Sequence, residues 1–188
     1  MTRPNQALAT TQRFVLPLPN RKAVAVNVPT MRRLKDKEVK GLLREVIGRY
    51  PTAATLESAG SFEEVTVGED AVYFADGAPL LIRTKLGFLP SLKFEKLLMS
   101  LPHVTVDMGA VAHVVNGADV MRPGIKVVEG DFGKNELVVI VDEKYRKPIA
   151  LGFSEVDSVE MRRLNKGKVV RNVHYVGDEL WKSFSKPV

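Results

Sequence analysis

Apolar residues at helical spacing define the first element that the chain predicts. After Asp36, a residue suited to the N-cap position, apolar side chains recur three and four residues apart, and Pro51 follows the last of them. This spacing places them on one face, so we expect an amphipathic helix over residues 36–50. The stripe consists of Val39, Leu42, Leu43, Val46, Ile47 and Tyr50.

Between residues 62 and 83 the pattern changes to short β-type runs. Three runs, Glu64–Val67, Ala71–Ala75 and Pro79–Arg83, are separated by polar turns. Asp76-Gly77 lies between two of them, and an Asp-Gly pair in that position favours a tight hairpin. The pattern therefore predicts a three-stranded antiparallel meander.

A second helical stripe follows the meander. Pro90-Ser91 has the character of a helix start, and the apolar residues behind it again recur three and four positions apart. We expect a short helix that packs on the sheet and ends before Pro102. Its stripe consists of Phe94, Leu97, Leu98 and Leu101.

The next unit begins with a strand and a capped helix. Val104–Val106 is β-rich, and Asp107 is suited to cap a helix that Gly117 terminates. The repeat of apolar residues within this helix indicates one buried face. That face consists of Val111, Val114 and Val115.

Short β-rich runs dominate the remainder of the chain. One helix interrupts them; Asp157 caps it, and it runs to Asn165, with Gly167 just past its end. Many short strands with two small helices are typical of a mixed, partly closed β-barrel. The β-rich runs are Ile125–Val128, Leu137–Val141, Ile149–Phe153, Lys168–Val170 and Asn172–Val176.

Together these elements predict an α+β fold class, with an α+β domain at residues 31–103 and a mixed β pseudo-barrel at residues 104–182. Residues 183–188 form a tail. Residues 1–30 contain several prolines and one strand-like run, Ala23–Val28. They are either a native N-terminal arm or an extension that results from start-codon choice.

The segment Val114–Gly124 connects two apolar runs and is rich in turn residues. Gly117 is able to take a positive φ, and Pro123-Gly124 has the form of a type II turn. We expect a rigid loop with exposed backbone donors, and rigid loops often carry function. The alternative is that the segment merely ends a helix and begins a strand.

The net charge of +6 is distributed unevenly. Residues 1–50 hold 11 Lys/Arg against 3 Asp/Glu, residues 51–103 hold 4 against 7, and residues 104–188 hold 13 against 12. A basic end beside an acidic middle fits a polyanion such as RNA, although a solvated basic surface produces the same pattern. The basic residues of the first helix region are Arg32, Arg33, Lys35, Lys37, Lys40, Arg44 and Arg49.

Several kinds of site find no support in the sequence. The chain has no cysteine, and His103, His113 and His174 show no ligand spacing, so we expect no metal site. No phosphate-binding or dinucleotide-binding glycine motif and no nucleophile elbow is present, so we expect no cofactor and no enzyme activity. No apolar run suffices to span a membrane and no secretory signal is visible, so we expect a cytoplasmic protein without a membrane partner.

Basic residues recur around the loop and the last helix. Such donors are able to converge on phosphates. Tyr175 and Trp181 are expected to pack the end of the barrel rather than to stack on bases. The candidate RNA-binding side chains are Arg122, Lys126, Arg162, Arg163, Lys166, Lys168 and Arg171.

Five motifs in the second half agree in order with one known family. They occupy residues 106–111, 115–124, 150–152, 165–168 and 174–181, and include the runs VNGADVMRPG and HYVGDELW. They resemble a PUA domain, named for pseudouridine synthases and archaeosine transglycosylases. The helix, meander and helix ahead of them resemble the pre-PUA domain of the malignant T-cell-amplified sequence family, including its archaeal members and its yeast translation machinery-associated homologue.

The resemblance implies RNA binding in a cleft between the first PUA helix, the glycine loop and an adjacent strand. Carried over residue by residue, it marks a contact loop. The loop residues are Gly117, Ala118, Asp119, Val120, Met121, Arg122, Pro123 and Gly124.

We therefore predict a non-enzymatic, archaeal-type protein of translation that binds tRNA or rRNA, and with it the small ribosomal subunit. The resemblance also implies a density-regulated-protein-like partner. That partnership is left open by the basic arm and by the absence of the cysteines found in some eukaryotic relatives. One alternative is an accessory RNA-binding subunit of a tRNA or rRNA modification enzyme, and another is a protein-interaction adapter that uses the meander and the acidic middle.

Overall fold

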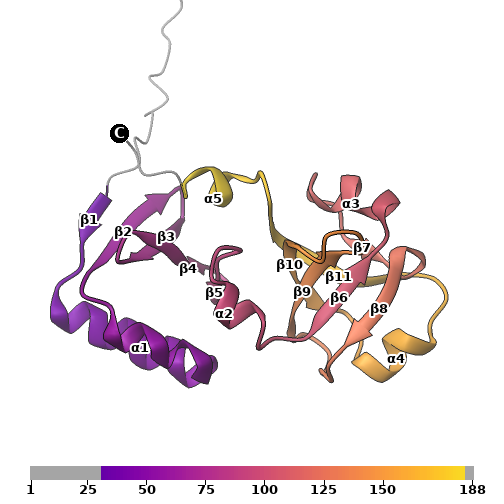
Figure 1. The fold of residues 1–188 in the computed structure, drawn as a ribbon, viewed down its shortest axis with the longest axis horizontal. Coiled ribbons are helices and arrows are strands. Elements are labelled where there is room, and N and C mark those ends of the chain that lie inside the picture. The colour runs from indigo at the N-terminus through magenta and orange to yellow at the C-terminus, as the bar shows by residue number, and fades with distance from the viewer. Residues whose placement is uncertain (1–30, 185–188) are drawn as a thin grey trace, which may run out of the picture.

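The structure is a computed structural model that describes residues 31–184. These residues form two β-sheets side by side along the long axis, with the short helices α2 (Glu95–Leu98) and α5 (Glu179–Lys182) between them (Figure 1). The strand predicted at residues 23–28 lies outside the described residues. Within residues 31–184, no helix has both the length and the apolar character needed to cross a bilayer.

The N-terminal sheet has five antiparallel strands in the order β1-β2-β3-β4-β5. Its centre is the predicted meander, and Asp76 and Gly77 form the hairpin turn with φ values of 47° and 80°. The two outer strands are not predicted, because three or four residues are too few to show alternation. The strands are β1 (Met31–Arg33), β2 (Phe62–Val67), β3 (Asp70–Ala75), β4 (Ala78–Thr84) and β5 (Gly87–Pro90).

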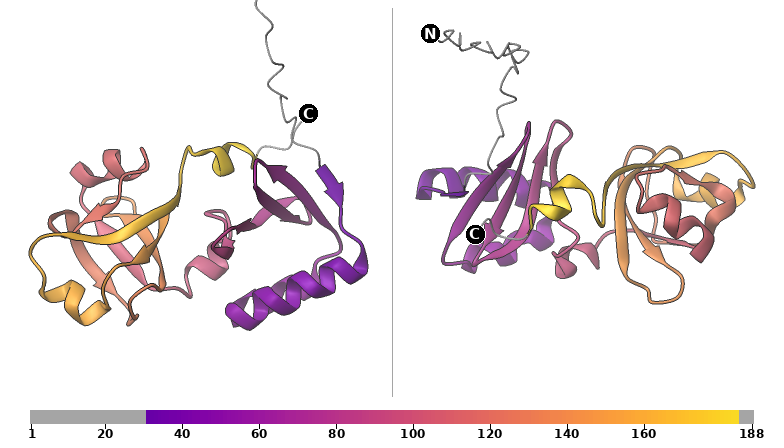
Figure 2. Two further views of the ribbon diagram at one scale, coloured as in Figure 1. Left: turned by 180° about the vertical axis from the view of Figure 1, so that it is seen from behind. Right: turned by 90° about the horizontal axis from the view of Figure 1, so that it is seen from above.

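The predicted first helix is α1 (Asp36–Arg49), which lies along one face of this sheet (Figure 2). Its predicted cap is wrong: the N-cap is Lys35, whose backbone N–H donates to Glu38 Oε2 at 2.8 Å. Because Glu38 supplies the carboxylate, Asp36 becomes the first helical residue. Pro51 ends α1 but also begins an unpredicted 3₁₀ helix, η1 (Pro51–Ser58).

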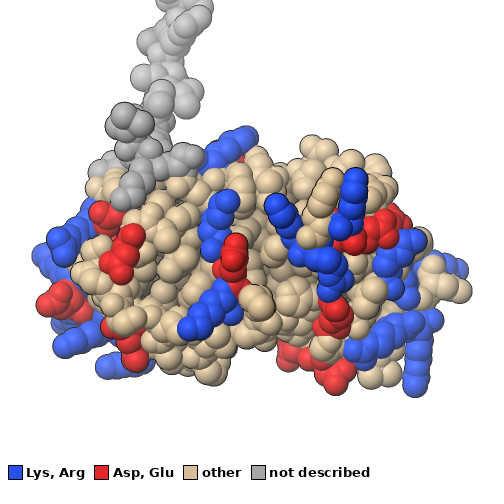
Figure 3. Space-filling view, in the orientation of Figure 1, with Lys and Arg blue, Asp and Glu red and all other residues tan. Residues whose placement is uncertain are grey.

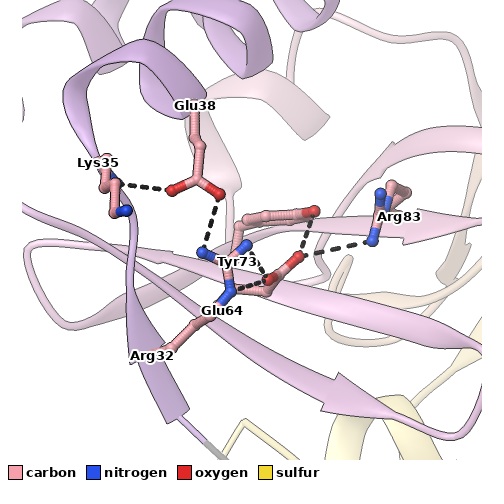
Figure 4. Close-up of polar contacts among 6 residues, drawn as sticks. All are labelled: Arg32, Lys35, Glu38, Glu64, Tyr73 and Arg83. Carbon is pink, nitrogen blue, oxygen red and sulfur yellow. Dashed lines mark hydrogen bonds and ion pairs between the residues drawn. The ribbon is translucent and has the colours of Figure 1, made fainter.

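A buried carboxylate ties β1 to the centre of the sheet (Figure 4). Glu64 is 7% exposed and accepts hydrogen bonds from Arg32 Nε at 2.8 Å and from the Tyr73 hydroxyl at 2.7 Å. Arg83 Nη2 lies 3.5 Å from the same carboxylate. Burial and the hydrogen bond with Glu64 raise the pKa of Tyr73 well above its usual range. The edge strand β1 is thus held by side chains as well as by its backbone ladder.

The helix predicted behind Pro90-Ser91 is a single turn, α2. Phe94, Leu97 and Leu98 of its apolar stripe are buried as expected and Leu101 is partly buried, but Pro90 belongs to β5. The Ser91 hydroxyl donates to Pro79 O, and the helix begins only at Glu95. Because this hydrogen bond holds Ser91 against β4, the residues just after Pro90 do not join the helix, and α2 is shorter than predicted.

The C-terminal sheet has six strands in the order β7-β11-β10-β9-β6-β8 and curls into a partly closed barrel (Figures 1 and 2). Neighbouring strands are antiparallel except for β6 and β9, which are parallel. The last two predicted strands are one strand, β11, whose pairing shifts opposite Leu151 and Gly152. The strands are β6 (His103–Val106), β7 (Val120–Met121), β8 (Ile125–Glu129), β9 (Leu137–Asp142), β10 (Pro148–Ser154) and β11 (Lys168–Tyr175).

Two predicted aspartate caps are confirmed in this half. Asp107 accepts the backbone N–H of Ala110 at 2.8 Å and begins α3 (Met108–Val114). Asp157 accepts that of Glu160 at 2.8 Å and begins α4 (Ser158–Arg163). Helix α4 ends two residues before the predicted Asn165, because Leu164 adopts extended backbone.

One buried apolar cluster is shared by both sheets, and a second fills the barrel. The shared cluster includes Phe74 of the first sheet, Phe153 of the second and Leu180 of α5. Tyr175 packs against the barrel cluster, as predicted. Trp181 was also expected to pack the barrel end, but it packs against the shared cluster, because α5 returns the chain toward the N-terminal sheet (Figure 1).

Candidate functional site

A cleft of about 640 Å³ lies between α3 and the loop that follows it. One face of α3 supplies Gly109, Ala110 and His113, spaced one and three residues apart so that they share a side of the helix. The loop supplies the other wall, including Met121 and Pro123. The lining is mostly apolar, and many of its side chains are small.

The loop is fixed by its own backbone. The N–H groups of Asn116, Gly117 and Ala118 donate to carbonyls at the end of α3, at 3.0–3.1 Å. The N–H of Arg122 donates to Gly167 O at 2.8 Å. These hydrogen bonds agree with the expected rigid loop, which remains a prediction. The expectation of exposed backbone donors is wrong for these four amides, because they are bonded within the protein.

Two glycines are required by close approach. Gly117 has φ +87°, and a Cβ there would lie 3.1 Å from the ring of Tyr175. A Cβ on Gly124 would lie 2.9 Å from Ala110 Cβ, so this glycine sets how closely loop and helix pack. Pro123-Gly124 is not the predicted type II turn: the residues Arg122–Gly124 form a 3₁₀ turn, η2, and Gly124 lacks a positive φ.

Arg122 supports the loop from behind. Its Nε donates to Met161 O at 2.7 Å and its Nη1 to Ile125 O at 3.1 Å, while Nη2 lies 3.5 Å from Arg162 O. Arg122 is absent from the cleft lining. The predicted contact residue is thus a strut between the loop and the C-terminal end of α4.

Two carboxylates at the cleft are paired with lysines. Asp107 Oδ2 lies 3.9 Å from Lys126 Nζ, and Asp119 Oδ2 lies 3.2 Å from Lys168 Nζ. The hydrogen bond and charge of Asp119 raise the pKa of Lys168. Asp119 also accepts the backbone N–H of Asn172 at 2.9 Å. Positive charge therefore lies at the rim, while the cleft interior carries carboxylates.

The N-terminus of α3 is already occupied by acidic side chains. Asp107 caps it, and Glu143 Oε1 accepts the N–H of Met108 at 2.9 Å. A phosphate would meet two carboxylates there instead of free amides. The cleft therefore suits an uncharged group, such as a base or a sugar, with phosphates at the rim lysines.

The other predicted basic residues do not converge on the cleft. Arg162 donates to Gly130 O at 2.6 Å and pairs with Asp131 at 3.2 Å, which ties α4 to the loop behind β8. Arg171 lies over the ring of Phe153, 5.5 Å from its centroid. Arg163 and Lys166 are exposed on and after α4.

Comparisons with known proteins identify the family of the chain. The PUA domain model matches residues 102–176. An uncharacterized protein of Methanocaldococcus jannaschii is 34% identical over 152 residues, which cover 79% of this chain and 93% of that protein. Translation machinery-associated protein 20 of Saccharomyces cerevisiae is 29% identical over 168 residues, 82% of this chain and 93% of its own.

The chain belongs to the PUA-domain family of translation machinery-associated protein 20 and the malignant T-cell-amplified sequence proteins. A PUA-domain structure from Aeropyrum pernix, a tartrate complex, has a TM-score of 0.70 to this chain at 30% identity. The match covers 84% of this chain and 91% of that one. The α+β fold with a C-terminal PUA domain is therefore confirmed, and several relatives of this chain are named for the translation machinery.

Sequence reasoning missed Asn172 of the PUA domain. Its Nδ2 donates to Val114 O at 2.9 Å and to Ala118 O at 3.1 Å, so it holds the end of α3 and the loop together. No local pattern indicates this, because the partners are more than 50 residues away in the chain. Gly109, Ala110 and His113 carry a clearer signal, since helical spacing from Asp107 places them on the loop side.

Proposed function

We propose that this PUA protein binds a structured RNA of the translation machinery, either tRNA or rRNA of the small ribosomal subunit, without catalysing a reaction. The observation that carries the proposal is the cleft beside the loop Gly117–Gly124, whose loop wall is held by backbone hydrogen bonds within the protein. Relatives named for the translation machinery support the choice of RNA.

In the proposed mechanism, the apolar cleft takes a base or sugar of an unpaired RNA end. Lys126 and Lys168 lie at the rim, where their ammonium groups are able to move from Asp107 and Asp119 to RNA phosphates. The exposed cations of α1 add sequence-independent attraction, which falls with salt. Because the loop is fixed, little conformational entropy is lost on binding.

A charge on the cleft wall tests the proposal. Met121 lines the cleft and is 51% exposed, so Met121→Asp should leave the fold intact. We expect it to weaken tRNA binding at least tenfold in a mobility-shift assay, because the new carboxylate repels phosphate. Val159→Asp is the matched control, since Val159 is also 51% exposed but lies on α4 outside the cleft lining. Equal affinity of Met121→Asp and wild type would refute the cleft as the binding site.

Sedimentation separates translation from RNA modification. The proposal predicts that the wild-type protein migrates with small ribosomal subunits in a sucrose gradient of cell extract. The Met121→Asp variant should no longer migrate with them. A density-regulated-protein-like partner belongs to the same proposal and would migrate in those fractions. Co-purification with a modification enzyme, without ribosome association, would instead favour an accessory subunit.

A further inference from the structure

Helix α3 separates the cleft from a second groove. Gly109, Ala110 and His113 face the cleft, whereas Met108 and Val111 line a groove of about 510 Å³ on the other side. The far wall of this groove comes from the N-terminal half and from α5, through Lys93 and Trp181 among others. A helix is about 10 Å across, so a ligand in the cleft is within a few nucleotides of the groove.

Two aromatic rings with lysines beside them mark the groove. Tyr145, in the turn between β9 and β10, is 62% exposed, and Lys144 Nζ lies 4.9 Å from its ring centroid. Trp181 is partly buried, with Lys93 Nζ 4.4 Å from its centroid. Aromatic rings that reach the surface beside ammonium groups are a combination that binds unpaired bases and their phosphates.

The charge at the groove favours an anionic ligand. Lys93, Lys144 and Lys147 are all exposed. In the middle of the face where α2, α5 and α3 lie, several Lys and Arg side chains reach the surface, with Asp and Glu side chains among them (Figure 3). Of the nearby carboxylates, buried Asp142 accepts the backbone N–H groups of Tyr145 and Lys147. Glu143 is engaged at the N-terminus of α3, which leaves Glu95 as the acidic side chain on the rim.

We infer that this groove, lined by Lys93, Met108, Val111, Tyr145, Lys147 and Trp181, binds a second, single-stranded stretch of the RNA whose end occupies the cleft. The inference rests on the proposed function. Three features favour RNA as the ligand: the groove lies just across α3 from the cleft, it has two aromatic rings, and it has three lysines. An acidic protein segment would match the charge, but it would not extend from a ligand in the cleft. The two halves of the molecule thus contribute jointly to one RNA path.

Oligonucleotide length provides the test. We would measure fluorescence anisotropy of labelled single-stranded RNAs of about four and about eight nucleotides with the full chain. The wild type should bind the longer RNA about tenfold more tightly, and Tyr145→Ala and Lys93→Ala should each remove most of that gain. The two variants should bind the shorter RNA with the same affinity as the wild type. Lys96→Ala is the matched control, because Lys96 is exposed on α2 but outside the groove lining, and it should keep the gain.

The salt dependence adds a readout that loss of folding would not mimic. For the longer RNA, Lys93→Ala should lower the slope of log affinity against log salt by about 0.7, with no change for the shorter RNA. A length gain that survives in both groove variants overturns the inference and leaves the cleft proposal standing. Failure of the wild type to bind either RNA overturns both. Binding of a polyglutamate peptide provides the remaining comparison. If Lys93→Ala abolishes peptide binding but keeps the gain in affinity for the longer RNA, the inference is overturned and the groove binds an acidic protein segment instead.

Discussion

Arg122 holds the loop beside the cleft through hydrogen bonds to backbone carbonyls, and it does not line the cleft itself. Its guanidinium reaches carbonyl oxygens on α4 and at the start of β8, and planar guanidinium groups suit such divergent acceptors. The sequence places Arg122 in the loop that forms one wall of the cleft, and the structure agrees with that position. Its role was not predictable, because Met161 and Arg162 lie 39 and 40 residues further along the chain.

Replacement of Arg122 distinguishes two roles of this side chain, which are to hold the loop in place and to contact an RNA phosphate. We expect Arg122→Ala to lower the free energy of unfolding by about 1–3 kcal/mol, because carbonyl acceptors are left without their donor. RNA affinity should fall through displacement of the loop, with an unchanged salt slope. The measurements are urea denaturation and a salt series of mobility-shift assays, with exposed Arg163→Ala as control. A slope reduced by about 0.7–0.9 would show instead that Arg122 contacts a phosphate.

Asp178 joins the end of β11 to the start of α5. Its carboxylate accepts the N–H groups of Tyr175 and Trp181 and lies 2.7 Å from Nδ1 of buried His174. Burial opposes its ionisation, but His174 and the two backbone donors outweigh burial and lower the pKa of Asp178. The ionised carboxylate is therefore part of the native structure.

This lowered pKa predicts an acid-dependent stability. A carboxyl group with a depressed native pKa stabilises the fold above its unfolded pKa of about 3.9 and loses that effect as the pH falls through the native value. We expect Asp178→Asn to cost about 1–3 kcal/mol at pH 7 and progressively less below about pH 4. Urea denaturation across pH measures this difference. A constant difference from pH 7 to pH 3 would contradict it.

Among the elements, length decides what the sequence predicts. The 14 residues of α1 and the strands of the meander show their periodicity plainly. Strands β1 and β7 have three and two residues, and α5 has four, so no period is visible in them. These short elements form because their partners are already in place: β7 pairs with β11, and α5 packs on the shared cluster.

Helix α1 also contains two glycines that its conformation does not require. An added Cβ on Gly41 or Gly48 would meet no atom within 4 Å, and neither has a positive φ. Because alanine favours a helix interior over glycine, Gly41→Ala should stabilise the protein by about 0.5–1 kcal/mol. Gly117→Ala is the opposite case and should destabilise it through strain and contact with Tyr175. Thermal denaturation of the two variants should give shifts of opposite sign.

On the scale of the whole molecule, the shared apolar cluster couples the two sheets. The second sheet contributes Leu137, Val139 and Phe153 to it, and α5 contributes Leu180. Binary patterning predicted two units but not this junction, since each strand's pattern shows that a face is buried and not what buries it. The domain limits 31–103 and 104–182 remain predictions.

The junction predicts cooperative unfolding. Trp181 is the chain's one tryptophan and lies at the junction, so its fluorescence reports that region. We expect fluorescence and far-ultraviolet circular dichroism to give coincident urea transitions. Leu180→Ala should lower the free energy of unfolding by about 2–4 kcal/mol, because it opens a cavity under α5, and it should shift the fluorescence and circular dichroism transitions together. Two resolved transitions in the wild type would show that the halves unfold independently.

The hydrogen bonds within the loop also have a consequence for the rate at which the proposed RNA ligand would bind. A site whose walls are held by Asn172, Arg122 and the loop's own amides has no ordering step to complete after encounter. The observed association rate should therefore rise linearly with RNA concentration in stopped-flow experiments and fall with salt, with no plateau from a slow rearrangement. Under the proposed function, differences in affinity among RNAs should then lie in how long each RNA remains bound, and residence time is the quantity to compare.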